Sequence, residues 1–182
     1  MIKKAVIPAA GLGTRMLPLT KTQPKEMLPL GKKPCIHYIV EELTSVGVTQ
    51  ILFITGHKKR AIEDYFDRDN ELSRLLSLSG QKDLIKEIEL DDINVTFYYT
   101  RQSIPAGLGH AVSCARDFVG NEPFIIALGD SIIYSTEKSI LLDRMIKQHK
   151  KDISSFVIGT RRVSMEDVHR YGIIVPEGAA KG

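Results

Sequence analysis

Residues 5–15 read AVIPAAGLGTR, and this order of residue types decides the fold that we expect. An apolar run of this kind is typical of a buried strand, and the glycines Gly11 and Gly13 follow it at once. Without a Cβ atom, the chain at these two positions can adopt positive φ and turn its N–H groups toward a ligand at close range. The stretch therefore predicts a strand that ends in a phosphate-binding loop.

Two cations near this loop favour a nucleotide as the ligand. Arg15 can direct two N–H donors at phosphate oxygens, and Lys25 supplies a mobile point charge. Read alone, a Gly-x-Gly turn fits a plain tight turn as well as it fits a ligand loop. The two common phosphate motifs are excluded, because Met16 stands where a dinucleotide fingerprint needs glycine and no Gly-Lys-Ser/Thr follows at P-loop spacing.

Composition narrows the class of protein. The 182 residues are enough for one domain with a real core, and 43% of them are hydrophobic and 26% charged, as in an ordinary globular protein. No apolar run is long enough for a membrane span, and the first apolar stretch is too short for a signal peptide, so we expect a cytoplasmic protein. Two cysteines, Cys35 and Cys114, predict neither a disulfide framework nor a zinc site.

The net charge of +3 is too small to indicate a polyanion as partner. We therefore expect neither a nucleic acid nor a membrane to bind. We interpret the clusters of basic residues as solvated ends of helices and loops: Lys3-Lys4, Lys58-Lys59-Arg60, Lys150-Lys151 and Arg161-Arg162.

Strand-like runs alternate with helical patterns along the chain, which is typical of a parallel sheet with helices on both faces. Helices are predicted over 34–47, 58–66, 108–119 and 140–149. A leucine-dotted stretch at 67–93 predicts a helical insertion, and no domain boundary is evident, so we predict a single domain over 1–182. The predicted strands are 4–9, 50–55, 94–100, 123–128 and 153–160, and a further strand begins at Tyr171.

Ligands of open α/β folds bind outside the carboxyl ends of the strands, so residues that follow strands are the candidates. Gln102 follows the predicted strand 94–100, and its amide can pair with one edge of a nucleobase. Gly107 precedes the helix 108–119 and lets a flat base approach the backbone. Alone, Gln102 fits an exposed strand end better, and the glycines after it favour a base site. For His110, in the first turn of that helix, a packing role is the simpler interpretation.

Asp130 follows the predicted strand 123–128. A carboxylate there suits magnesium, which takes one or two protein oxygens and fills its octahedron with water and phosphate. A turn aspartate after Gly129 is the other interpretation, and the neighbouring phosphate loop favours the metal. Gly172, at the start of the last predicted strand, would let a sugar ring approach the backbone.

Together these motifs resemble those of the bacterial UTP-glucose-1-phosphate uridylyltransferases, which are sugar nucleotidyltransferases. The resemblance implies a Rossmann-like α/β fold of the nucleotide-diphospho-sugar transferase type, with a mostly parallel sheet flanked by helices on both faces. It also implies a magnesium-dependent enzyme that converts UTP and glucose 1-phosphate to UDP-glucose and pyrophosphate. The matching segments occur in the family's order: 5–15, 25–29, 101–102, 107–111, 129–130 and 171–172.

The same resemblance implies roles for single residues. Arg15 and Lys25 would be the catalytic cations on the phosphates, Asp130 would bind magnesium and Gly172 would face the glucose. The attacking sugar-phosphate oxygen is already anionic, so catalysis reduces to alignment and charge neutralisation. The nucleotide would be held by Ala9, Ala10, Gly11, Gly13, Glu26, Gln102 and Gly107.

The family continues beyond the position of Gly182 into a Glu-Lys-Pro segment that holds sugar and phosphate, and into a second metal-binding aspartate. We therefore expect a sheet that is incomplete at its carboxy-terminal side, and we expect full-length relatives to be homo-oligomers. Two alternatives stay open. One is a thymidylyltransferase of the same fold, and the other is a catalytically incomplete nucleotide-binding or regulatory short form.

Overall fold

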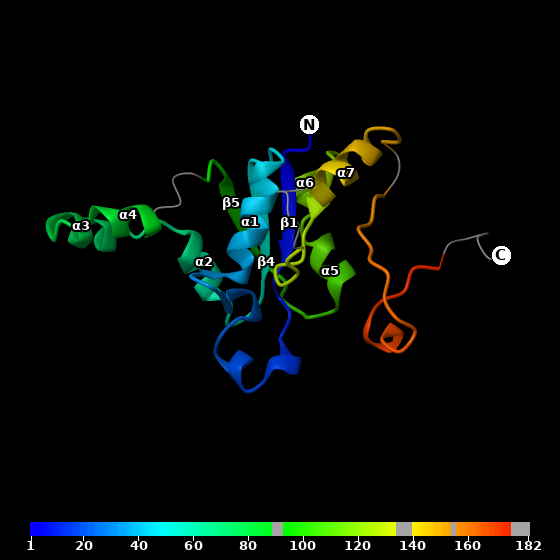
Figure 1. The fold of residues 1–182 in the computed structure, drawn as a ribbon, viewed down its shortest axis with the longest axis horizontal. Helices are drawn as coiled ribbons and strands as arrows, with labels where there is room; N and C mark the ends of the chain where they lie inside the picture. Colours follow the sequence, from blue (N-terminus) through cyan, green and yellow to red (C-terminus); the bar gives the residue numbers. More distant parts are fainter. Residues whose placement is uncertain (89–92, 134–139, 154–155, 176–182) are drawn as a thin grey trace. The chain divides into compact units, whose positions relative to one another are not determined.

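The computed structural model describes residues 1–88, 93–133, 140–153 and 156–175 (Figure 1). The chain divides into two compact units, Met1–Asp143 and Arg144–Gly182, and each is described by itself. The first unit contains the sheet and most of the predicted site residues.

A four-stranded sheet in the order β5-β4-β1-β6 forms the centre of the first unit. All its pairings are parallel, and Lys4 of β1 lies opposite Gln50 of β4 and Phe124 of β6. The expected parallel α/β sheet is thereby confirmed. Its strands are β1 (Lys4–Pro8), β4 (Gln50–Thr55), β5 (Thr96–Arg101) and β6 (Phe124–Ile126), and a short antiparallel pair, β2 (Pro29–Leu30) and β3 (Lys33–Pro34), lies outside it.

Helices cover both faces of this sheet (Figure 1). On one face lie α1 (Cys35–Ser45) and α2 (Arg60–Phe66), and on the other lie α5 (Leu108–Ser113) and α6 (Arg116–Val119). The remaining elements are α3 (Asn70–Leu78), α4 (Lys82–Ile88), α7 (Ile140–His149), and the 3₁₀ turns η1 (Thr14–Met16), η2 (Leu19–Lys21), η3 (Lys25–Met27) and η4 (Val168–Arg170).

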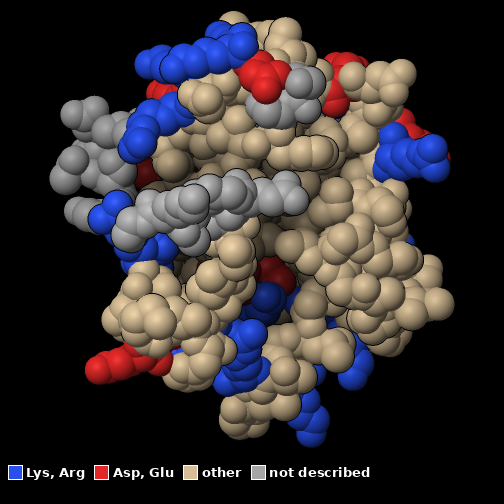
Figure 2. All heavy atoms as spheres, turned by 90° about the vertical axis from the view of Figure 1, so that its right-hand side faces the viewer, with Lys and Arg blue, Asp and Glu red and all other residues tan. Residues whose placement is uncertain are grey.

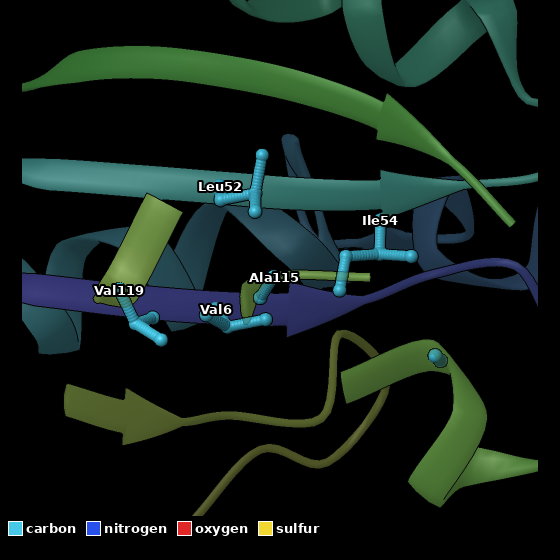
Figure 3. Close-up of a cluster of buried hydrophobic side chains, with 6 residues drawn as sticks. Val6, Leu52, Ile54, Ala115 and Val119 are labelled. Carbon is cyan, nitrogen blue, oxygen red and sulfur yellow. The ribbon is translucent and has the colours of Figure 1, made fainter. Parts of the chain in front are cut away.

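The core side chains alternate along the strands, because successive residues of a strand point to opposite faces. Figure 3 shows one face, where β1 and β4 pack against the α5–α6 segment. The buried cluster there consists of Val6, Leu52, Ile54, Ala111, Ala115 and Val119. Ile7, Ile51 and Phe53, on the inner strands but outside this cluster, are also fully buried. Both faces of the inner strands are therefore withdrawn from water, as in parallel sheets generally.

The opposite face is organised around Phe53 of β4. Its ring is fully buried and stacks on Phe66 of α2 with 5.0 Å between ring centroids. It also stacks on Phe97 and Tyr99 of β5 at 5.7 and 5.5 Å. One aromatic side chain thus joins two strands and a helix.

Three predicted elements differ from the structure. The helix predicted over 108–119 is interrupted, because Ala115 donates its N–H to Val112, three residues back, which tightens the turn between α5 and α6. The strand predicted over 153–160 is wrong for its described residues, and so is the strand predicted to begin at Tyr171 over the described residues 171–175. An apolar run becomes a strand only where a neighbour takes up its backbone hydrogen bonds, and Phe156 is 97% exposed.

Replacing Phe53 by alanine tests the role of this ring. We expect F53A to lower the free energy of unfolding by about 3–5 kcal/mol, since it removes a buried aromatic side chain and leaves a cavity. Urea denaturation followed by circular dichroism measures the loss. The matched control is F156A, which removes an exposed ring and should change stability by no more than about 0.5 kcal/mol. Equal losses in the two variants would contradict this account of the core.

Candidate functional site

The carboxyl ends of β1 and β4 lie against each other and form the floor of the candidate site. Directly after β1, Ala9 donates its N–H to the carbonyl of Ile54 at 2.8 Å. Directly after β4, a Cβ atom on Gly56 would stand 3.1 Å from the carbonyl oxygen of Ala10. The backbone at Ala9 and Ala10, both predicted to hold the nucleotide, therefore lies where the two strands end.

The glycine loop departs from the sequence-based expectation at one of its two glycines. Gly13 has the left-handed φ of 68°, and Thr20 donates its hydroxyl to the carbonyl of Gly13 at 2.7 Å. Gly11 does not adopt positive φ. It lies beside Lys25, because a Cβ atom on Gly11 would be at ordinary contact distance, 3.5 Å, from Cε of that lysine. Arg15 is exposed in η1 and pairs with no carboxylate in the part of the chain that the structure describes.

Lys25 and Asp130 form an ion pair beside this loop. Nζ of Lys25 lies 2.6 Å from Oδ2 of Asp130, and the two side chains are 25% and 38% exposed. The structure thus brings together Gly11, Lys25 and Asp130 from three separate parts of the sequence. Both charged groups reach water, so the pair can exchange partners when a charged ligand arrives.

The negative charge of Asp130 also acts on Cys35, the first residue of α1. Burial, together with the negative charge of Asp130, raises the pKa of the Cys35 thiol. The thiol is consequently protonated near neutral pH and is a poor nucleophile. We therefore assign no covalent chemistry to Cys35.

Glu26, the next residue after Lys25, points into the protein. It is 1% exposed, and its Oε2 accepts a hydrogen bond from Nζ of Lys59 at 2.8 Å. Its other oxygen, Oε1, is buried without a hydrogen-bond partner among the described residues. A buried carboxylate oxygen without a donor is costly, so a donor on a ligand would be bound favourably there.

Lys59 is a functional candidate that the sequence analysis missed. Its cluster was interpreted as solvated, but Lys59 is 6% exposed, whereas Lys58 and Arg60 on either side are exposed. The interpretation was also wrong for Lys4, which pairs with Glu122 with a side chain only 15% exposed. Lys59 follows β4 by four residues, so the rule that ligands gather after strands indicates the cluster Lys58-Lys59-Arg60 but not which of its members is buried.

Gln102 is buried at the end of β5, with 7% of its surface exposed. Its side-chain Nε2 lies 3.1 Å from the carbonyl oxygen of Gly107 and 2.9 Å from Nδ1 of His110. Gly107 has φ of 91° and stands directly before α5. His110 is exposed and bonded to Gln102, so the expected packing role is wrong.

Gly172 belongs to the second unit and is exposed there. Its assignment to the sugar stays a prediction.

On the face drawn in Figure 2, basic side chains are interspersed with acidic and uncharged ones. In the described part of the chain, no helix is both long and apolar enough to cross a membrane.

This edge of the sheet is where open α/β folds bind their ligands, and the fold is of the α/β class whose members bind nucleotides there. The chain matches the family model of nucleotidyl transferases over residues 4–181, and it belongs to that family. It is 47% identical over 175 residues to a UTP-glucose-1-phosphate uridylyltransferase of Bacillus subtilis (strain 168). The aligned residues cover 96% of this chain and 59% of that relative. The chain therefore spans about three fifths of the length of this curated relative.

Solved structures give the same class. A UTP-bound UGPase from Acinetobacter baumannii is 42% identical, with a TM-score of 0.79, over 84% of this chain and 54% of that one. A UDP-glucose pyrophosphorylase complexed with UDP-glucose is 38% identical, with a TM-score of 0.81, over 100% of this chain and 66% of that one. The Rossmann-like nucleotidyltransferase fold expected from the sequence is confirmed.

Removing the charge of Lys59 tests the buried pair. We expect Lys59→Met to lower the free energy of unfolding by about 3–5 kcal/mol, because it leaves the Glu26 carboxylate buried without a counter-charge. Urea denaturation at neutral pH measures this loss. Lys58→Met, at the exposed neighbour, is the matched control and should change stability by about 0.5 kcal/mol or less. A K59M protein as stable as K58M would contradict the account of Glu26 and Lys59 as a buried ion pair.

Proposed function

We propose that this chain supplies the nucleotide-binding side of a site that transfers a uridylyl group from UTP to glucose 1-phosphate. The products are UDP-glucose and pyrophosphate. The observation that carries the proposal is the pair of Lys25 and Asp130 at 2.6 Å beside the glycine loop. A cation for phosphate and a carboxylate for a metal are the two groups that this reaction requires. The names of the uridylyltransferase and UGPase relatives support the choice of reaction.

The reaction is one in-line displacement at phosphorus. A phosphate oxygen of glucose 1-phosphate forms a bond to the α-phosphorus of UTP, and the bond from that phosphorus to the bridging oxygen of pyrophosphate breaks. The attacking oxygen is already anionic, so no side chain has to remove a proton. Lys25 would bind the phosphates and neutralise the charge that collects on the leaving group, and the exposed Arg15 is free to do the same.

Magnesium is part of the proposal, and Asp130 fits it. No group of three or more metal-binding side chains occurs among the described residues, and Asp130 offers its carboxylate beside Lys25. Magnesium is commonly held by one or two carboxylates together with substrate phosphates and water. When bound, it would neutralise charge on the phosphates. Asp130 would then give up its contact with Lys25, whose ammonium becomes available to the nucleotide.

The nucleoside would be held by Glu26, Gln102 and Gly107. The unsatisfied Oε1 of Glu26 offers an acceptor to a donor of the nucleoside, and the left-handed Gly107 presents backbone without a side chain. A cytoplasmic location and a homo-oligomeric full-length protein are further parts of this proposal, and both are carried over from the sequence-based expectations.

The test is pyrophosphate release from UTP with glucose 1-phosphate and magnesium. We expect Lys25→Met to lower kcat by roughly 10²–10³-fold, the loss typical of removing one group that stabilises charge in the transition state. The matched control is Lys32→Met, at a lysine that is 86% exposed and 3.4 Å from Glu87, which should retain the original rate.

Each other outcome contradicts a stated part of the proposal. An unchanged rate in K25M would remove the catalytic role of Lys25. A clear preference for dTTP over UTP would favour the thymidylyl alternative. UTP binding without pyrophosphate release by the unaltered chain would favour the nucleotide-binding alternative.

A further inference from the structure

The side-chain amide of Gln102 is held by a turn that directly follows it. The backbone N–H of Gln102 donates to the carbonyl of Thr55 at 2.9 Å, which fixes the residue at the end of the sheet. With 7% of its surface exposed, its side chain has little water to bond with. Which atom of the amide faces which neighbour therefore has a large effect on its energy.

The neighbours determine the orientation of the amide. A backbone carbonyl can only accept, so the atom of Gln102 that lies 3.1 Å from the Gly107 oxygen must be Nε2, which donates. The same Nε2 lies 2.9 Å from Nδ1 of His110. Since Nε2 donates there too, Nδ1 must carry a lone pair, and the proton of the neutral imidazole sits on its own Nε2.

Both amide hydrogens of Gln102 are consequently in use. Its remaining hydrogen-bonding atom is the carbonyl oxygen Oε1, which has no partner among the described residues and can only accept. An N–H group on a ligand is what this oxygen can bind.

We propose that His110 is a positioning residue that sets base specificity, by holding Gln102 so that it offers a nucleobase an acceptor and not a donor. The choice of uracil as that base rests on the proposed function. Uracil has an N–H at ring position 3, whereas cytosine has a bare nitrogen there. A site whose unpaired group is an acceptor binds the first and rejects the second, because two facing acceptors would both stay unpaired once the base excludes water.

The first turn of α5 supplies both acceptors that hold the Gln102 amide, the Gly107 carbonyl and Nδ1 of His110. The carbonyl of Gly107 also accepts the N–H of Ala111 at 3.1 Å, which closes the first turn of α5. A carbonyl oxygen has two lone pairs, so it can serve the helix and Gln102 together. His110 lies on the same turn and adds the second acceptor. Without His110, one amide hydrogen would lose its partner and the amide would be held at only one point.

The experiment compares three variants by calorimetric titration with UTP and with CTP in the presence of magnesium. His110→Ala removes the acceptor, and His110→Asn keeps an acceptor oxygen near the place of Nδ1. Ser113→Ala is the matched control on α5, because the Ser113 hydroxyl donates to the backbone carbonyl of His110 at 2.7 Å and not to Gln102.

We expect H110A to lower the affinity for UTP by about tenfold and to leave the affinity for CTP nearly unchanged, so that the preference for UTP falls about tenfold. H110N should stay within about threefold of the original preference, and S113A should equal it. A parallel loss for both nucleotides in H110A would show that His110 has only a structural role and would overturn the proposal. So would an H110N protein as impaired as H110A.

A second measurement needs no nucleotide. Nitrogen-15 spectra of the free protein report which ring nitrogen of His110 carries the proton. We expect the proton on Nε2, and a proton on Nδ1 would overturn the hydrogen bond from Gln102 on which the proposal is built. The unaltered chain could also fail to bind UTP while the proton of His110 is found on Nε2. That result would overturn the proposed function and the base preference, and the contact between Gln102 and His110 would still hold.

Discussion

The parallel pairing of β1 between β4 and β6 is the constraint on which the rest of the structure depends. Because β4, β1 and β6 run in one direction with Lys4 opposite both Gln50 and Phe124, their carboxyl ends reach the same edge of the sheet. The glycine loop follows β1, Lys59 follows β4, Gln102 follows β5 and Asp130 follows β6. Residues more than a hundred positions apart in the sequence therefore meet at one edge.

A second constraint acts at that edge, where the pair of Glu26 and Lys59 is buried. A buried ion pair has a high desolvation cost, and replacing it with apolar side chains of similar size is often neutral for stability. Here the carboxylate also keeps one oxygen without a partner among the described residues. Gly129 packs closely against it, since a Cβ atom there would come within 3.1 Å of Cγ of Glu26 and the side chain would have to shift by a few tenths of an ångström. The arrangement supports the proposed role of Glu26 in holding the nucleoside.

The sequence predicted the elements whose signals are local or strongly periodic. The strand at 50–55 and the helix at 140–149 agree with β4 and α7 residue for residue, because apolar runs and helical spacing determine them directly. The strand at 153–160 failed because strand formation depends on a pairing neighbour, which the sequence of one segment does not contain.

The candidate site was predictable to a similar extent. Gly11, Gln102 and Asp130 were indicated by residue type and by their places after strands, and Lys25 by its charge and its nearness to the glycine loop. The structure brings Gly11, Lys25 and Asp130 together. Lys59 could not be separated from Lys58 and Arg60, because burial within a basic cluster depends on contacts with distant residues. The contact between His110 and Gln102 depends in the same way on the turn at Gly107. Gly11 was expected to share the left-handed conformation of Gly13, but only Gly13 has positive φ, and Gly11 instead lies beside Lys25.

Hydrogen–deuterium exchange of the whole chain with and without UTP and magnesium tests most directly whether this edge of the sheet binds the nucleotide. The account predicts slower exchange of backbone amides in residues 9–15, 102–113 and 128–131 when the nucleotide is present. It predicts no change at the opposite ends of the strands, around Lys3, Thr49 and Asn94. Slower exchange confined to those opposite ends, or none anywhere with the nucleotide bound, would contradict it.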